Sequence, residues 1–127
     1  MSNVTNEEAE GAYQVLVVED EFLIADELRR VLISGGFRVM GPVSSNEDAL
    51  DLIDQDKPDF AVLDVYLGAE TVTPVALELQ RLKVPFVLAS ASSPHELASS
   101  PVLADAINLG KPTGSGQLIA TVRKLIG

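Results

Sequence analysis

The sequence predicts an α/β domain in which five parallel strands form one sheet with helices on both faces. Short runs rich in Val, Leu and Ala alternate five times with segments whose apolar residues recur at helical spacing. Parallel strands need crossover connections of this kind, and the crossovers are right-handed. Of the 127 residues, 46% are hydrophobic and 5% aromatic, which suits a sheet covered by helices around one aliphatic core.

The first two strand–helix units are marked by buried-strand patterns and amphipathic segments. The segment 14–18, in which 15–18 are all apolar and mostly β-branched, is typical of a strand buried on both faces, and the helical pattern at 22–32 stops at a pair of glycines. A second strand at 38–43 leads to a short helix at 46–53, for which Asn46 is a natural N-cap.

The next two units contain a third buried strand at 60–63 and a fourth strand at 85–89. Between them, a loop that contains Gly68 precedes a helix at 73–82, because Pro74 is favoured in the first turn of a helix. These two strands continue the parallel sheet.

The last part of the pattern is weaker. Helical character extends over 94–103 but is interrupted by Pro101. A short strand at 106–109 and a helix at 115–126 then complete the fifth unit.

The composition excludes several classes of protein. A net charge of −10 argues against a nucleic-acid partner, because affinity for phosphate backbones comes largely from Lys and Arg. The chain has no cysteine, and hence no disulfide and no cysteine-based zinc site. It has no apolar run of about 20 residues that could span a bilayer and no apolar core of a signal peptide. We expect a cytoplasmic protein with a mobile acidic leader at 1–12 and one domain at 13–127.

Polar side chains follow the strands at the edge of the sheet where ligands bind in folds of this kind. Glu19 and Asp20 follow the first strand, Asp64 the third, Ser90 the fourth and Lys111 the fifth. Carboxylates on neighbouring strands repel each other unless a cation lies among them, and Mg²⁺ suits such oxygen ligands. An Asp carboxylate can attack phosphorus when a metal and an ammonium neutralise the transferring oxygens. Each residue alone could be a turn, cap or surface residue, but their joint occurrence indicates a site with Asp64 as nucleophile.

Taken together, these motifs resemble the receiver domain of two-component response regulators over nearly the whole chain. The run 15–21 is similar to the first strand of the family with its acidic pair. The run 61–65 is similar to the phosphoacceptor strand, with Asp64 as the acceptor. Ser90 followed by Ala resembles the family's Ser/Thr-Ala step, and 110–112 resembles its lysine followed by proline.

The resemblance implies a flavodoxin-like (βα)5 fold with strand order 2-1-3-4-5. It also implies that a histidine kinase or a phosphotransfer protein donates a phosphoryl group to Asp64, and that output passes through a downstream protein partner. Ser90 would then turn to donate a hydrogen bond to the phosphoryl group, and Lys111 would pair with another of its oxygens. The implied Mg²⁺ ligands are the carboxylates of Glu19, Asp20 and Asp64 and the backbone carbonyl of Tyr66.

The chain departs from the family pattern at two places. It is partly similar to single-domain receivers of alphaproteobacteria whose fourth strand reads Phe-Ala-Thr-Gly, but Ser90 and Ala91 replace Thr and Gly here. The aromatic residue that the family usually has three positions before Lys111 is Asn108. A rotating aromatic ring therefore cannot carry the signal at that position.

Two alternatives remain beside a phosphoacceptor that catalyses only its own phosphorylation and dephosphorylation. A haloacid-dehalogenase-type phosphohydrolase would need a second acid two residues after Asp64, where this chain has Tyr66. A degenerate receiver would bind its partner without phosphorylation, although the acids, Ser90 and Lys111 are all present. The single histidine, His95, is expected on the surface.

Overall fold

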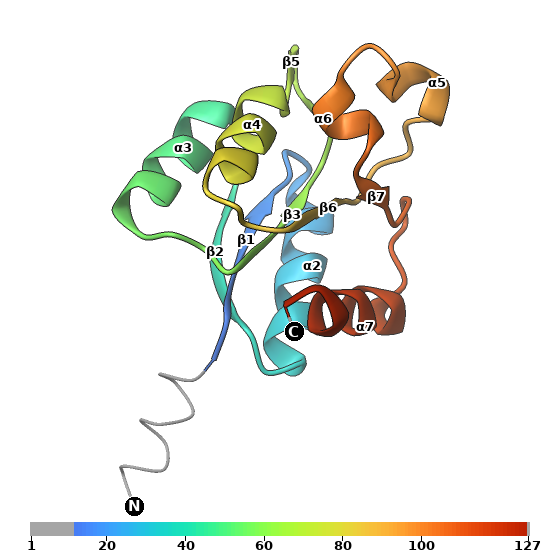
Figure 1. Cartoon of the computed structure of the whole chain (residues 1–127). Coiled ribbons are helices and arrows are strands. Elements are labelled where there is room, and N and C mark those ends of the chain that lie inside the picture. Colours follow the sequence, from blue (N-terminus) through green and yellow to red (C-terminus); the bar gives the residue numbers. More distant parts are fainter. Residues whose placement is uncertain (1–11, 127) are drawn as a thin grey trace, which may run out of the picture.

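A five-stranded parallel sheet forms the centre of the molecule (Figure 1), in a computed structural model that describes residues 12–126. Its strand order is β2-β1-β3-β6-β7, so the predicted order 2-1-3-4-5 is confirmed once the five strands are counted along the chain. The predicted leader, 1–12, lies almost wholly outside the described residues and stays a prediction. The strands are β1 (Gln14–Val18), β2 (Arg38–Val43), β3 (Phe60–Leu63), β6 (Phe86–Leu88) and β7 (Ile107–Asn108).

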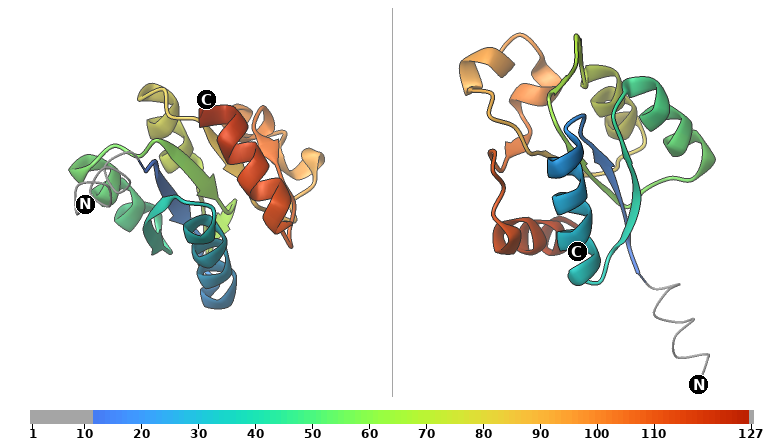
Figure 2. Two further views of the ribbon diagram at one scale, coloured as in Figure 1. Left: turned by 90° about the horizontal axis from the view of Figure 1, so that it is seen from below. Right: turned by 180° about the vertical axis from the view of Figure 1, so that it is seen from behind.

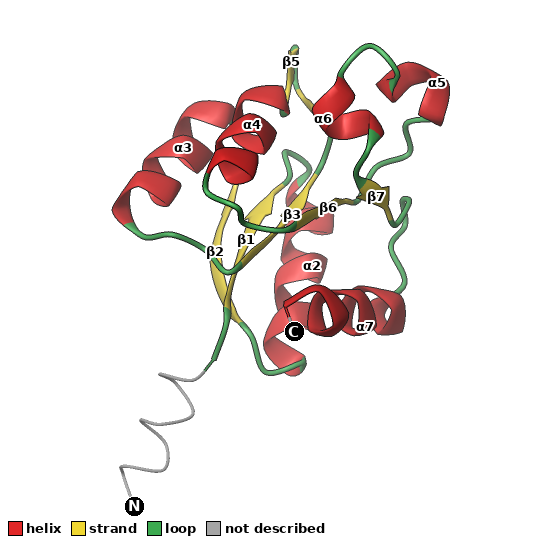
Figure 3. Cartoon of the chain, viewed as in Figure 1, coloured by secondary structure: helices red, strands yellow, loops and turns green. Residues whose placement is uncertain are grey.

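Helices cover both faces of the sheet, as the alternation of strands and helices predicts (Figure 2). One face is covered by α2 and α7, which contact each other, and the other by α3, α4 and the two short helices α5 and α6 (Figure 3). No helix within residues 12–126 has both the length and the apolar character needed to cross a membrane. The helices are α2 (Phe22–Ser34), α3 (Asn46–Gln55), α4 (Thr73–Arg81), α5 (Pro94–Leu97), α6 (Pro101–Ala104) and α7 (Ser115–Ile126).

The central strands are buried on both faces, which explains their unbroken apolar runs. In β1, Leu16 and Val18 pack under α3 and α4, whereas Val15 and Val17 pack under α2 and α7. All four are fully buried. Each such aliphatic side chain contributes about 1.5–3 kcal/mol relative to an exposed one, so the two faces anchor β1 firmly at the middle of the sheet.

A small hairpin lies where the sequence indicates only a loop. It consists of β4 (Tyr66–Leu67) and β5 (Glu70–Thr71), which pair antiparallel directly after the end of β3. Gly68 in its turn has a φ of 64°, a conformation that glycine adopts without steric cost. The hairpin holds the backbone beside the carboxyl end of β3 in a defined shape.

The prediction that Asn46 caps α3 is wrong. Ser45 is the N-cap, and its hydroxyl accepts a hydrogen bond from the Asp48 N–H at 3.1 Å. Asn46 is instead the first residue of the helix and is 9% exposed. Its Nδ2 donates to the Thr71 carbonyl at 2.8 Å and to Glu70 Oε1 at 3.1 Å. Asn46 therefore ties α3 to the hairpin.

The other differences concern boundaries. The strands predicted at 85–89 and 106–109 are shorter in the structure, and the helices predicted to end at residues 32 and 53 each extend two residues further. The segment 94–103 forms two helices of four residues separated at Pro101, as the predicted interruption indicates. All ten predicted elements are otherwise present.

Candidate functional site

Three carboxylates meet at the carboxyl ends of β1 and β3, as the sequence predicts. Glu19, Asp20 and Asp64 each offer one oxygen, and these oxygens lie within 4.8 Å of one another. The Asp64 N–H donates to the Val18 carbonyl at 2.8 Å, and the Glu19 N–H donates to the Val43 carbonyl at 2.9 Å. These backbone bonds extend the strand pairing into the acidic residues and so fix where their side chains begin.

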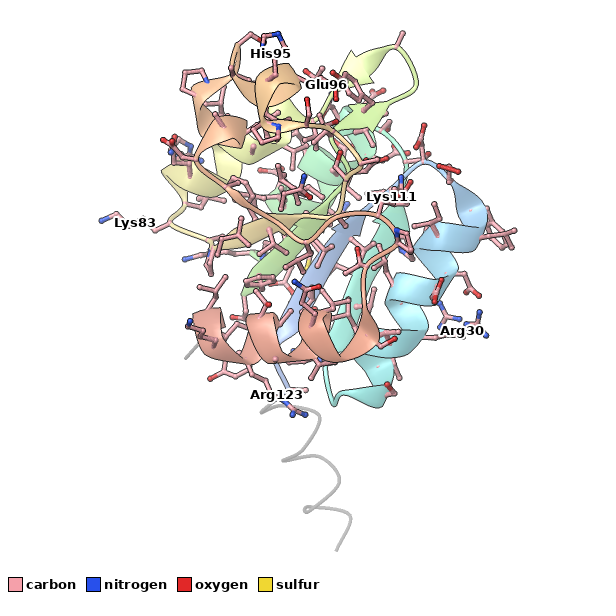
Figure 4. The ribbon with its side chains drawn as sticks, turned by 90° about the vertical axis from the view of Figure 1, so that its right-hand side faces the viewer. Arg30, Lys83, His95, Glu96, Lys111 and Arg123 are labelled. Carbon is pink, nitrogen blue, oxygen red and sulfur yellow. The ribbon has the colours of Figure 1, made fainter. Side chains whose placement is uncertain are left out.

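Lys111 enters this cluster from the turn after β7 (Figure 4). Its Nζ lies 3.1 Å from Asp64 Oδ2 and 3.2 Å from Glu19 Oε1, and it lies 3.6 Å from the exposed carboxylate of Glu21. Glu19 is only 3% exposed and Asp64 only 7%. One ammonium thus faces two buried carboxyl groups, so when both are ionised one negative charge is left without a cation.

The electrostatics of the cluster follow from burial. Burial raises the pKa of Glu19 to about 7, and the charge of Asp64 raises it as well, while hydrogen bonds from the Glu21 N–H and Lys111 oppose the rise. Burial lowers the pKa of Lys111, but its hydrogen bonds and the charges of Asp64 and Glu19 outweigh that effect and leave its pKa above the ordinary value. Lys111 is therefore a fixed positive charge, and Glu19 retains a proton more readily than an ordinary carboxyl.

The donor set fits a hard divalent cation. Glu19 Oε1 is buried and accepts no hydrogen bond from any described residue, although it lies 3.2 Å from Lys111 Nζ. A buried, unsatisfied carboxylate oxygen is costly, and a cation close to it would remove that cost. Three carboxylates with room for water or phosphate oxygens match the coordination that Mg²⁺ prefers.

The hairpin after β3 also contacts the acids. The Gly68 N–H donates to Asp20 Oδ2 at 2.9 Å, and the Val65 N–H donates to Asp64 Oδ1 at 2.8 Å. Asp20 is exposed, so its carboxylate is held by the hairpin backbone and not by burial. The hairpin therefore orients Asp20 and also carries Tyr66, whose carbonyl the resemblance assigns to the metal.

An open cavity of about 570 Å³ lies above the cluster. Asp20, Asp64, Ser90 and Lys111, all expected from the sequence, line it. The cavity is large enough to admit a phosphoryl group on a partner protein. Its walls also include Glu21, Gly68, Ser92 and Glu96, which sequence reasoning did not assign to the site.

Ser90 follows β6 and is 3% exposed. Its hydroxyl donates to Ser92 Oγ at 2.9 Å and accepts the Ser92 N–H at 3.0 Å. Neither bond is made to Asp64. The hydroxyl is thus held beside the cavity by its own loop. The sequence gives no sign of this local bond, because Ser92 is one of several serines in the segment.

Residues 15–123 match the sequence model of a protein family, the response regulator receiver domain. The chain belongs to this family. The positive alginate biosynthesis regulatory protein of Pseudomonas aeruginosa is 34% identical over 87% of this chain and 46% of its own length. The chain spans about half the length of the curated relatives it matches.

Solved receiver domains have the same fold. The signal receiver domain of a modulated diguanylate cyclase from Desulfovibrio desulfuricans G20 has a TM-score of 0.80 and 28% identity, covering 91% of this chain and 94% of that one. The REC domain of the response regulator PhyR from Erythrobacter litoralis has a TM-score of 0.78 and 24% identity, covering 91% of each chain. The second likeness shows the fold alone.

Membership gives this receiver domain a general role. Receiver domains are signalling domains that interact with histidine kinases and downstream partners, and they generally bind Mg²⁺ at an acidic pocket. In this chain Glu19, Asp20 and Asp64 form an acidic cluster at the strand ends. His95 is exposed on α5 and away from the cluster (Figure 4), as predicted.

Proposed function

We propose that this receiver domain accepts a phosphoryl group on Asp64 from the phosphohistidine of a kinase or a phosphotransfer protein. The observation that carries the proposal is the position of Asp64. It lines the cavity with Ser90 and Lys111, and its Oδ2 lies 3.1 Å from the Lys111 ammonium. An anionic nucleophile with an adjacent fixed cation is suited to attack phosphorus.

Asp64 is a better acceptor than the other two acids. Glu19 is 3% exposed, and because its pKa is raised to about 7, a smaller fraction of it is ionised near neutral pH. Asp20 is exposed, and the Gly68 N–H already holds one of its oxygens. Asp64 keeps an oxygen directed to Lys111 while the Val65 N–H holds the other in place.

In the proposed reaction an Asp64 oxygen forms a bond to phosphorus as the bond between phosphorus and the donor's histidine nitrogen breaks, and the imidazole leaves as a neutral ring because its other nitrogen already carries a proton. Lys111 pairs with a phosphoryl oxygen. Glu19, Asp20, Asp64 and the Tyr66 carbonyl would hold Mg²⁺, which when bound neutralises charge on the transferring oxygens. Water then attacks the phosphorus, the bond from phosphorus to the Asp64 oxygen breaks, and inorganic phosphate leaves with the Asp64 carboxylate restored.

The proposed switch begins at Ser90. To donate to a phosphoryl oxygen, its hydroxyl has to exchange its bond to Ser92 for one to the new group. Residue 92 is two residues before α5, so a change in this loop reaches the short helices α5 and α6 first. We infer that output is a contact of this region with a downstream protein in the cytoplasm.

The experiment is phosphorylation by acetyl phosphate with Mg²⁺, followed by intact-protein mass spectrometry. Wild type should gain one phosphoryl group, and Asp64→Asn should gain none. Asp54→Asn is the matched control, because it makes the same chemical change at an exposed position of α3 and should be labelled like wild type. Labelled Asp64→Asn would refute the assignment of the acceptor.

The same experiment separates the alternatives. A wild-type protein that gains no label and gives no response to beryllofluoride with Mg²⁺ would support a receiver that binds its partner without phosphorylation. Continuous release of phosphate from small phosphomonoesters would support a phosphohydrolase. Stable single labelling of Asp64 contradicts both.

A further inference from the structure

Asn108, the last residue of β7, accepts two backbone hydrogen bonds on one side-chain oxygen. Its Oδ1 lies 3.1 Å from the Ser90 nitrogen and 3.0 Å from the Gly110 nitrogen, and both N–H groups donate to it. Its Nδ2 donates to the Ser92 carbonyl at 3.4 Å, a longer and weaker bond. One side chain thus joins the segment after β6 to the turn after β7.

Each of these two segments carries one group of the proposed phosphoryl site, one of them uncharged and the other cationic. Ser90 carries the hydroxyl, and Gly110 is followed directly by Lys111, whose ammonium reaches Asp64. The backbone of both segments is therefore positioned by the same Asn108 oxygen. A shift of that oxygen would change the separation of the hydroxyl and the ammonium.

The sheet itself does not hold these segments together. Pairing of β6 with β7 ends at Leu88 and Asn108, and the next backbone bond, from the Leu109 N–H to the Leu88 carbonyl at 2.8 Å, lies before Ser90. Beyond that point, the Ser90 N–H donates its hydrogen bond to the Asn108 side chain and not to the backbone of the neighbouring strand. The Asn108 amide continues the connection where the backbone pairing stops.

The turn after β7 has a side-chain hydrogen bond of its own, from the Thr113 hydroxyl to the Gly110 carbonyl at 2.7 Å, but this bond does not reach the loop after β6. Gly110 has a φ of 83°, a region that glycine enters freely but from which it can also leave freely. Asn108 is half-buried, so water cannot replace its bonds to the two N–H groups without entering between the segments. Within residues 12–126, the side-chain hydrogen bonds that join this turn and β7 to the loop after β6 are those of the Asn108 amide.

We propose that Asn108 is a positioning residue that sets the distance between the Ser90 hydroxyl and the Lys111 ammonium, so that both meet a phosphoryl group on Asp64. This inference rests on the proposed function of Asp64. Asn108 stands where the resemblance leads us to expect an aromatic ring, and it acts through fixed hydrogen bonds where a ring would act by rotation. The hydrogen bonds of its amide go to Ser90, Ser92 and Gly110 and not to the three carboxylates that would hold Mg²⁺.

The test compares two affinities in the full chain. Binding of Mg²⁺ alone reports on the carboxylates, and binding of beryllofluoride at saturating Mg²⁺ reports on the groups around the phosphoryl position. Asn108→Ala should weaken beryllofluoride binding about tenfold, the size expected for the loss of one or two hydrogen bonds. Its Mg²⁺ affinity should fall less than its beryllofluoride affinity, because the backbone bonds that place Glu19 and Asp64 and the Gly68 N–H bond that holds Asp20 do not involve Asn108.

Arg123→Ala is the matched control. It also removes one hydrogen bond from a side chain to the backbone, to the Gly35 carbonyl at 3.1 Å, and lies on α7 far from Lys111 (Figure 4). It should change neither affinity. Wild-type beryllofluoride affinity in Asn108→Ala, or an equal loss of Mg²⁺ affinity, would overturn the inference while leaving Asp64 as acceptor. No beryllofluoride response in the wild type would overturn both.

A second measurement keeps the inference testable if Asn108→Ala does not fold. Asn108→Asp keeps an oxygen that can accept both N–H groups, but it loses the donor to Ser92 and adds a negative charge. The amide protons of Ser90 and Gly110 should exchange slowly with solvent in wild type and in this variant, measured by NMR. Rapid exchange of either proton in wild type would show that Asn108 does not hold the two segments.

Discussion

Replacing Lys111 with methionine removes the ammonium from between two buried acids and keeps most of the side chain's length. The Nζ lies 3.1 Å from Asp64 Oδ2 and 3.2 Å from Glu19 Oε1. With an effective dielectric constant of about 20, each of these pairs attracts by about 5 kcal/mol. Part of that attraction only offsets the cost of burying the charges, so the net loss is smaller.

Removing one partner of a buried ion pair costs about 3–5 kcal/mol, because the other charge remains buried and unpaired. We therefore expect Lys111→Met to lose about 3–5 kcal/mol of unfolding free energy in EDTA near pH 8, where Glu19 with its pKa of about 7 is ionised. Millimolar Mg²⁺ should restore more stability to the variant than to wild type, because the cation then supplies the missing positive charge. At a concentration 100 times its Kd, a ligand stabilises by about 2.7 kcal/mol.

Urea unfolding followed by circular dichroism, in EDTA and in Mg²⁺, measures both quantities. Lys83→Met is the matched control, since Lys83 is exposed after α4 and points away from the site (Figure 4). It should lose little stability in either buffer. The reasoning is refuted if Lys111→Met is as stable as wild type in EDTA, or if Mg²⁺ stabilises the variant no more than it stabilises wild type.

Two further predictions concern Glu19 and Asn46. The pKa of Glu19 is about 7 in the folded protein against an ordinary 4.5, and this difference corresponds to about 3 kcal/mol of unfolding free energy. In metal-free protein that stabilisation is fully present below pH 4.5 and is lost as the pH rises through 7. Urea unfolding across this range should show a flatter pH profile for Glu19→Gln, and profiles of equal slope would contradict the assignment. Asn46→Ala should lose about 1–3 kcal/mol and bind Mg²⁺ more weakly in calorimetric titration, because the hairpin carrying Tyr66 loses its tie to α3. Unchanged Mg²⁺ affinity would show that other contacts hold the hairpin.

The positions of the strands and the location of the acids could be predicted because both depend on simple patterns, whereas the order of the strands was implied by the resemblance to receiver domains. A strand buried on two faces has an unbroken apolar run, as in β1 and β3. The carboxyl ends of parallel strands meet at one edge, so Glu19 and Asp64 had to approach each other once both followed central strands. Neither inference needs knowledge of distant side chains.

The features that could not be predicted depend on partners far away in the sequence. Ser45 and Asn46 are both good N-caps, and the choice follows from Asn46 bonding to Thr71, 25 residues later. The hairpin strands are two residues each, too short to show an alternating pattern. The bond from the Ser90 N–H to Asn108 Oδ1 likewise joins residues 18 positions apart.

The two short helices after β6 make the domain suitable as an optical sensor. Helices of four residues do not persist alone, and α5 and α6 are stabilised by the buried Leu97 and Leu103, by the Ser93–Glu96 capping box and by a 3.2 Å bond between the Thr73 and Ser100 hydroxyls. The chain contains no cysteine, so a cysteine placed at the exposed His95 of α5 would be its single thiol. A fluorophore attached there would sit on the element nearest to the Ser90 loop and convert the arrival of a phosphoryl group into a change of emission.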